Sequence, residues 1–157
     1  MNELSRSSLR GAAAGAAGTT ALNAVTYLDM ALRGRPASRS PEETIKKLSD
    51  LAHLGVPGSG DRQVDRIAGL GPLTGLLAGI GVGAAMGAVR SAGWRPGPLV
   101  SGLIATLGAL LGTNGPMTVL GITDPREWSA GDWVADVIPH LAYGMVTAGV
   151  LDGLGHP

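Results

Sequence analysis

Two ionisable side chains four residues apart, Asp136 and His140, are the strongest candidates for chemistry in this sequence. Residues at positions i and i+4 share one face of a helix, so this carboxylate and this imidazole can lie close together. Such a pair can hold a proton, orient a ligand or supply part of a metal site. It can also serve only as a polar lock between helices, and the sequence leaves these alternatives open.

Three further polar residues, Asp29, Asn23 and Asn114, interrupt apolar stretches of the chain. Polar groups inside long apolar stretches are costly to bury, so they usually face the protein interior and mark function. Asn114 directly precedes a Gly-Pro dipeptide, and the proline is expected to break the hydrogen-bond ladder of the helix and free carbonyl groups there. The structural alternatives are a simple kink at Asn114 and, for Asp29, an ion pair with Arg33 or a side chain that extends to the interface.

The elements that must position these residues are four apolar stretches of about 19 to 27 residues each. A helix needs about 20 residues to cross the hydrocarbon of a bilayer, and only 15% of this chain is charged. Its three tryptophans lie at the ends of stretches, as is typical of membrane interfaces. We therefore expect an all-α protein, a four-helix transmembrane bundle forming a single membrane domain over residues 1–157. The expected spans are about 11–32, 69–89, 97–122 and 133–153.

The first stretch is rich in alanine and threonine and is the weakest of the four. A signal peptide is the alternative, with Arg6 and Arg10 as its basic region. Because the apolar run continues to Leu32, which is long for a signal peptide, we expect a membrane span.

Four spans would place the connection 33–68 and the turn 124–132 on the same side of the membrane. The helix rise then puts four polar residues in one leaflet, at a depth of roughly 5–12 Å. The predicted polar intramembrane site consists of these four residues and a fifth from the first span: Asp29, Asn114, Asp136, His140 and Asn23.

Glycines recur every four residues through the second stretch and predict a close helix contact. They form one flat ridge along the helix: Gly71, Gly75, Gly79, Gly83 and Gly87. Apolar burial does not drive association in lipid, so small residues that let helices approach closely take on that role. This glycine zipper can receive a helix of the same chain or of a neighbouring subunit.

The charged connection 33–68 contains one predicted amphipathic helix, over about 41–54. Ser40 is expected as the N-cap, with Pro41 in the first turn and Glu43 completing a Ser-x-x-Glu capping box. Gly55 is expected to end this helix. The helix can lie on the membrane surface or pack as a connector.

Composition excludes several classes of function. The chain has no cysteine and a net charge of zero, so neither thiol chemistry nor nucleic-acid binding is expected. The sequence shows no nucleophile–base constellation, phosphate-binding loop or zinc spacing. We therefore predict no catalytic residues, no cofactor and no metal, and an enzymatic role is not favoured.

Taken as a set, these features resemble the YagU family of small bacterial inner-membrane proteins. The shared features of the C-terminal half are a Pro-Met pair, a Leu-Gly-Ile-Thr-Asp-Pro run, a tryptophan, and an acid four residues before a histidine. In this chain they are Pro116-Met117, residues 120–125, Trp133, Asp136 and His140. Asp29 and Arg39-Ser40-Pro41 match a further acid and an Arg-Ser-Pro segment that the family pattern implies.

The chain departs from that pattern at its acids and at one histidine. It has aspartate at two positions where the family pattern has glutamate, and Asn114 near a position where the pattern has histidine. The missing histidine weakens any interpretation that needs two imidazoles. The resemblance implies four spans in the inner (plasma) membrane and supplies no reaction.

Two functions remain as hypotheses. The first is a small multi-pass membrane protein that handles protons or transports a small solute through the polar site, as a homo-oligomer. The second is a non-catalytic scaffold or accessory subunit, whose glycine ridge docks helices of a larger membrane complex. Four arginines lie on the N-terminal side of the spans and eight basic residues lie on the other. That count favours an external N-terminus, whereas the family resemblance favours the reverse, and orientation stays open.

Overall fold

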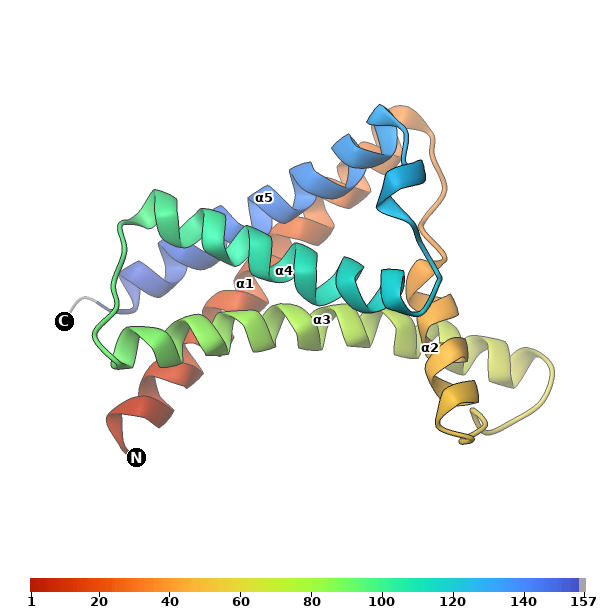
Figure 1. The fold of residues 1–157 in the computed structure, drawn as a ribbon, viewed down its shortest axis with the longest axis horizontal. Coiled ribbons are helices and arrows are strands. Elements are labelled where there is room, and N and C mark those ends of the chain that lie inside the picture. Colours follow the sequence, from red (N-terminus) through yellow and green to blue (C-terminus); the bar gives the residue numbers. More distant parts are fainter. Residues whose placement is uncertain (156–157) are drawn as a thin grey trace.

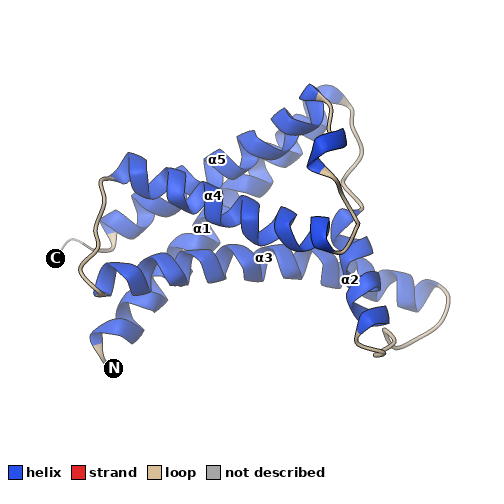
Figure 2. Ribbon diagram, in the orientation of Figure 1, coloured by secondary structure: helices blue, strands red, loops and turns tan. Residues whose placement is uncertain are grey.

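The computed structural model describes residues 1–155, and within that range the only regular secondary structure is helix, with no strand. The long helices are α1 (Glu3–Arg33), α3 (Asp61–Ser91), α4 (Pro98–Val119) and α5 (Ala130–Gly153). A shorter helix, α2 (Ser40–Leu51), lies in the first connection, and a 3₁₀ helix, η1 (Pro125–Glu127), lies in the last. Figure 2 shows that loops are confined to short segments between these helices.

The long helices pack side by side, with α1 against both α3 and α5, and α4 against α5. The contact between α3 and α4 is smaller, and α2 crosses one end of α3 (Figure 1). The start of α1, the end of α5 and the turn between α3 and α4 lie at one end of the molecule (Figure 1). The connection that follows α1 and the start of α5 lie at the other end.

Three helices, α3, α4 and α5, are long and apolar enough to cross a membrane. Their large side chains are mostly not covered by the rest of the chain: even in α5, only 39% of the most apolar segment is buried. Leu77 on α3 and Leu111 on α4 are 65% and 71% exposed. Exposed apolar surface on this scale marks contact with lipid or with another protein. α1 is not among the three, because its alanine, glycine and threonine residues make it less apolar.

Helices α1, α3 and α5 begin earlier than the apolar stretches that predicted them, because their polar ends continue as helix. α1 starts at Glu3, where the side chain of Asn2 accepts a hydrogen bond from the Ser5 amide at 2.8 Å. α3 starts at Asp61, after Gly60 with a φ of 57°. Hydropathy locates the apolar part of a helix, whereas caps and backbone dihedrals locate its ends.

The predicted capping box of the amphipathic helix is wrong. Arg39 is the N-cap of α2 and no side chain caps it, while Ser40 is already helical. The helix ends at Leu51, before the predicted limit of 54, and His53 adopts a left-handed φ of 54°. None of its residues is buried. A capping box does form at the start of α5, where Ser129 and Asp132 bond reciprocally.

The glycines of α3 divide between two neighbours instead of forming one continuous contact. A Cβ atom added to Gly83 would lie 2.7 Å from the Cα of Gly15, so no side chain fits between α1 and α3 there. Gly79 and Gly87 also face α1. Gly71 instead lies against the start of α2, and a Cβ atom at Gly75 would meet nothing within 4 Å. Of the five glycines, helix α1 therefore contacts only the last three.

The Gly-Pro dipeptide that follows Asn114 removes one hydrogen bond from the ladder of α4 without interrupting the helix. Helix α4 continues through Pro116 to Val119. A proline inside a helix removes one amide donor, and here the carbonyl left without its usual helical partner is that of Gly112. The effect is a single missing hydrogen bond, not an unwound segment.

Candidate functional site

The structure brings together polar side chains of α4 and α5, which we call the α4–α5 polar cluster: Thr113, Asn114, Asp136 and His140. The Asn114 amide nitrogen donates to Oδ2 of Asp136 at 2.8 Å. Oδ1 of the same carboxylate lies 3.6 Å from Nδ1 of His140. Both carboxylate oxygens of Asp136 therefore have a neighbour, one on each of the two helices.

Both ring nitrogens of His140 are engaged. Nδ1 lies 2.7 Å from the backbone carbonyl of Asp136. A carbonyl can only accept, so Nδ1 carries a proton. Nε2 lies 3.3 Å from the hydroxyl of Thr113 on α4. The ring is largely enclosed, with a side-chain exposure of 10%, so these contacts hold it in one orientation.

The hydroxyl of Thr113 connects the ring to the backbone of α4. Its oxygen lies 2.9 Å from the carbonyl of Ala109 and can donate its single proton there. It then accepts a hydrogen bond from Nε2, which requires a protonated imidazolium. Alternatively the hydroxyl donates to Nε2, which requires a neutral imidazole. Rotation of one hydroxyl thus accommodates both charge states of His140 without moving a helix.

Each helix of the cluster carries an internal proline close to the polar residues. Pro139, next to His140, is buried inside α5, and Pro116 lies two residues after Asn114 in α4. Each proline removes one helical donor and leaves a carbonyl with spare accepting capacity in the same region. The cluster is therefore richer in acceptors than ordinary packed helices are.

Asp29 and Asn23 do not join the cluster. Asp29 receives a hydrogen bond from the Arg35 guanidinium, and Arg33 lies 3.4 Å from its other oxygen. These two arginines follow Asp29 closely in sequence and neutralise the carboxylate locally. Asn23 is exposed on α1. The sequence placed Asp29 at a depth similar to that of Asn114, Asp136 and His140, but depth along a helix does not determine which way a side chain faces.

Sequence reasoning missed Thr113 as a member of the cluster. A threonine in an apolar helix usually bonds to its own backbone, as Thr113 also does, and so gives no signal of its own. The only signal in the sequence was its position directly before Asn114, a residue already predicted to belong to the polar site.

A buried tyrosine on α5 ties that helix to α3. Tyr143 is completely buried, and its hydroxyl donates to the backbone carbonyl of Gly79 at 2.6 Å. The ring reaches this carbonyl because Gly79 has no side chain. Tyr143 follows His140 by three residues, so this contact anchors the helix that carries the cluster.

A metal site is not supported by the geometry. Among residues 1–155, no three histidine, cysteine, aspartate or glutamate side chains are grouped so that they could hold an ion. Asp136 and His140 supply only two such ligands.

No known relative identifies the chain. No family model matches it, and neither the curated proteins nor the solved structures contain a significant match. Function is therefore argued from the polar cluster and from the character of the helices.

Proposed function

We propose that this chain is a multi-pass membrane protein that takes up and releases a proton at the α4–α5 polar cluster. The single observation that carries the proposal is the setting of the His140 ring. It lies between a carboxylate and a hydroxyl that can either donate or accept. An imidazole is the side chain best suited to exchange a proton near neutral pH.

The proposed cycle uses two states of the cluster. In the first, His140 is an imidazolium that donates to Thr113 and to the Asp136 carbonyl, with the Asp136 carboxylate balancing its charge. In the second, the Nε2–H bond has broken, its proton has passed to water outside the bilayer, and Thr113 rotates to donate to the neutral ring. Asn114 holds Asp136 in place in both states through the bond to Oδ2.

Four spans are the arrangement we propose for the membrane domain. α3, α4 and α5 meet the length and hydropathy that a span requires. The middle of α1 is buried against α3 and α5, so α1 would cross the bilayer with them, shielded by the more apolar helices. Trp94 between α3 and α4, and Trp128 and Trp133 at the start of α5, would then lie at opposite interfaces.

The location we propose is the bacterial inner membrane, in line with the resemblance to the YagU family. The Asp136 side chain is 22% exposed, so the cluster is close to the protein surface. A second copy of the chain would complete the enclosure of a path for protons, and we propose a homo-oligomer for this reason.

Proton uptake into proteoliposomes with an internal pH dye tests the proposal. Asp136→Asn and His140→Gln should each slow uptake by at least about tenfold, because each removes a group that holds the proton or balances its charge. Asp29→Asn is the matched control, since that carboxylate pairs with arginines away from the cluster. Uptake at the parent rate in folded Asp136→Asn and His140→Gln would remove the proposal.

A second candidate function is that of an accessory subunit in a larger membrane complex. It is favoured by the unfilled glycine face of α3, where a Cβ atom at Gly75 would meet nothing within 4 Å. Another helix could approach closely at this position. Binding of a partner at this position should be lost in the Gly75→Leu variant and kept in the His140→Gln variant. Proton uptake through the polar cluster should instead be lost in His140→Gln and kept in Gly75→Leu.

A further inference from the structure

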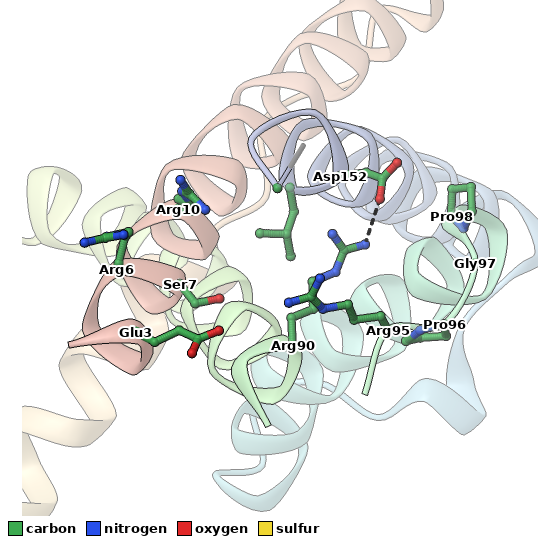
Figure 3. Close-up of a pocket in the computed structure, with 12 residues that line it drawn as sticks. Glu3, Arg6, Ser7, Arg10, Arg90, Arg95, Pro96, Gly97, Pro98 and Asp152 are labelled. Atoms are coloured by element: carbon green, nitrogen blue, oxygen red, sulfur yellow. Dashed lines mark hydrogen bonds and ion pairs between the residues drawn. The ribbon is translucent and has the colours of Figure 1, made fainter. Parts of the chain in front are cut away.

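We propose a second site, at the opposite end of the molecule from α2, that binds a phosphate group carried by an anionic lipid or by a small phosphorylated solute. The site is a cavity of about 690 Å³ between the start of α1, the end of α3, the turn into α4 and the end of α5. Figure 3 shows its lining. None of the residues of the α4–α5 polar cluster contributes to it.

Charge is the first feature of this cavity that points to an anion. Four arginines line it, together with two carboxylates, which leaves an excess of positive charge: Arg6, Arg10, Arg90 and Arg95 against Glu3 and Asp152. The arginines come from α1, from α3 and from the turn before α4, so the fold gathers them from separate parts of the chain. Guanidinium groups match the geometry of phosphate oxygens and can bind them in pairs.

Arg90 is the second feature. Its side chain is only 11% exposed and projects into the cavity (Figure 3). One terminal nitrogen lies 3.4 Å from Oδ1 of Asp152, while Nε is buried and has no hydrogen-bond partner among the described residues. A guanidinium has five donors, and a buried donor without a partner is costly. The donors that a phosphate oxygen in the cavity would meet are on the terminal nitrogens of this guanidinium, at the end of a side chain that lines the cavity.

The position of the cavity is the third feature. It lies where α3 and α5 end and α4 begins, which is the headgroup level if these helices cross a bilayer. Basic pockets between membrane helices at this level are suited to anionic lipid headgroups. Binding of a lipid phosphate depends on the proposed membrane location, whereas binding of a soluble phosphate does not depend on it.

Native mass spectrometry of the purified full chain in a neutral detergent tests the lipid source, with dioleoylphosphatidylglycerol and dioleoylphosphatidylcholine as probes. The informative variant is Arg10→Gln/Arg95→Gln, because both side chains are exposed and the fold is expected to tolerate their loss. Its affinity for the anionic lipid should fall about 25-fold, at about fivefold for each arginine. Arg39→Gln/Arg62→Gln removes the same charge at the other end of the molecule and should bind like the parent.

A thermal-unfolding arm with sodium phosphate, at ionic strength matched by sodium chloride, tests the soluble source. A Tm increase in the parent that is absent in Arg10→Gln/Arg95→Gln would assign the site to a free phosphate. Preference for phosphatidylglycerol with no response to phosphate would assign it to a headgroup. Equal binding by all three proteins, or no binding of either probe, would overturn the site. Proton uptake is measured separately, so failure here leaves the polar cluster untouched.

Discussion

At the scale of single residues, the α4–α5 polar cluster owes its properties to which groups can donate and which can accept. The Asp136 carbonyl fixes the proton on Nδ1 of His140, and only Nε2 is free to change its state. The oxygen that faces Nε2 belongs to Thr113, the only member of the cluster with a hydroxyl group. A hydroxyl can either donate a hydrogen bond to Nε2 or accept one from it. A residue with no ionisable group is therefore expected to matter as much as the two that have one.

Thr113→Val tests this at the residue scale. Valine has nearly the same shape but no hydroxyl, so an imidazolium at His140 loses its acceptor on Nε2 and proton uptake should slow about tenfold. Thr113→Ser restores the hydroxyl and should restore most of the rate. The measurement is uptake in proteoliposomes, with helicity by circular dichroism as the check on folding. Equal rates for the valine and serine variants would contradict the role given to Thr113.

Tyr143→Phe gives a second prediction at this scale. The variant removes the buried hydrogen bond to the Gly79 carbonyl while keeping the ring in place. Hydrogen bonds between membrane helices contribute up to about 1.7 kcal/mol, and the free energy of unfolding should fall by about 1 kcal/mol. Unfolding in mixed detergent measures it, and Tyr27→Phe is the control because Tyr27 is 63% exposed on α1. Equal loss in both variants would show that the buried bond contributes nothing.

At the scale of helices, close approach of backbones is what joins α1 to α3. The helices meet where Gly83 and Gly87 of α3 face Gly11 and Gly15 of α1, with Ser7 donating to the Gly87 carbonyl at 2.6 Å. Without side chains between them, two helices come near enough for backbone atoms to touch. In the proposed membrane location, the resulting dispersion attraction would take the place of apolar burial, which does not favour association in lipid.

Two alanine substitutions on α3 test whether stability depends on this particular contact or only on the number of glycines in the helix. Gly83→Ala would put a methyl group 2.7 Å from the Cα of Gly15, which only separation of the helices can relieve. Overpacking of this kind should cost about 1–3 kcal/mol or more in the free energy of unfolding. Gly75→Ala meets nothing within 4 Å and should be neutral or slightly stabilising. The free energies of unfolding of the two variants are measured in detergent. Similar values would contradict a close contact between α1 and α3 at Gly83.

At the scale of the whole molecule, the number of membrane crossings depends on whether α1 spans the bilayer. Its 31 residues make a helix roughly 46 Å long, enough to cross a bilayer, although its residues are not apolar enough for it to count among the candidate spans. Its small residues face α3 and α5, so its polar character is partly hidden by packing. A helix that is only marginally stable in lipid alone can still cross when its neighbours cover it.

Cysteine labelling decides whether α1 crosses, and the absence of native cysteine makes the chain well suited to it. Ser5→Cys, Ser38→Cys and Ala92→Cys each place one thiol at an exposed position beyond the apolar part of a helix. Four spans predict that cysteines at 5 and 92 react from one side of sealed vesicles and the cysteine at 38 from the other. Reaction of the cysteines at 5 and 38 from the same side would mean that α1 does not cross.

The sequence by itself determined the helical class, the approximate place of every α-helix and the pairing of Asp136 with His140. Those features depend on local periodicity, and a spacing of four residues places two side chains on one helix face wherever that helix goes. Tertiary structure alone decided that Asn114 meets Asp136, that Thr113 meets His140 and that Asp29 turns to its own arginines. It also divided the glycine repeat between α1 and α2. These outcomes depend on how each helix is rotated about its axis and where it crosses its neighbours, which no periodicity within one helix contains.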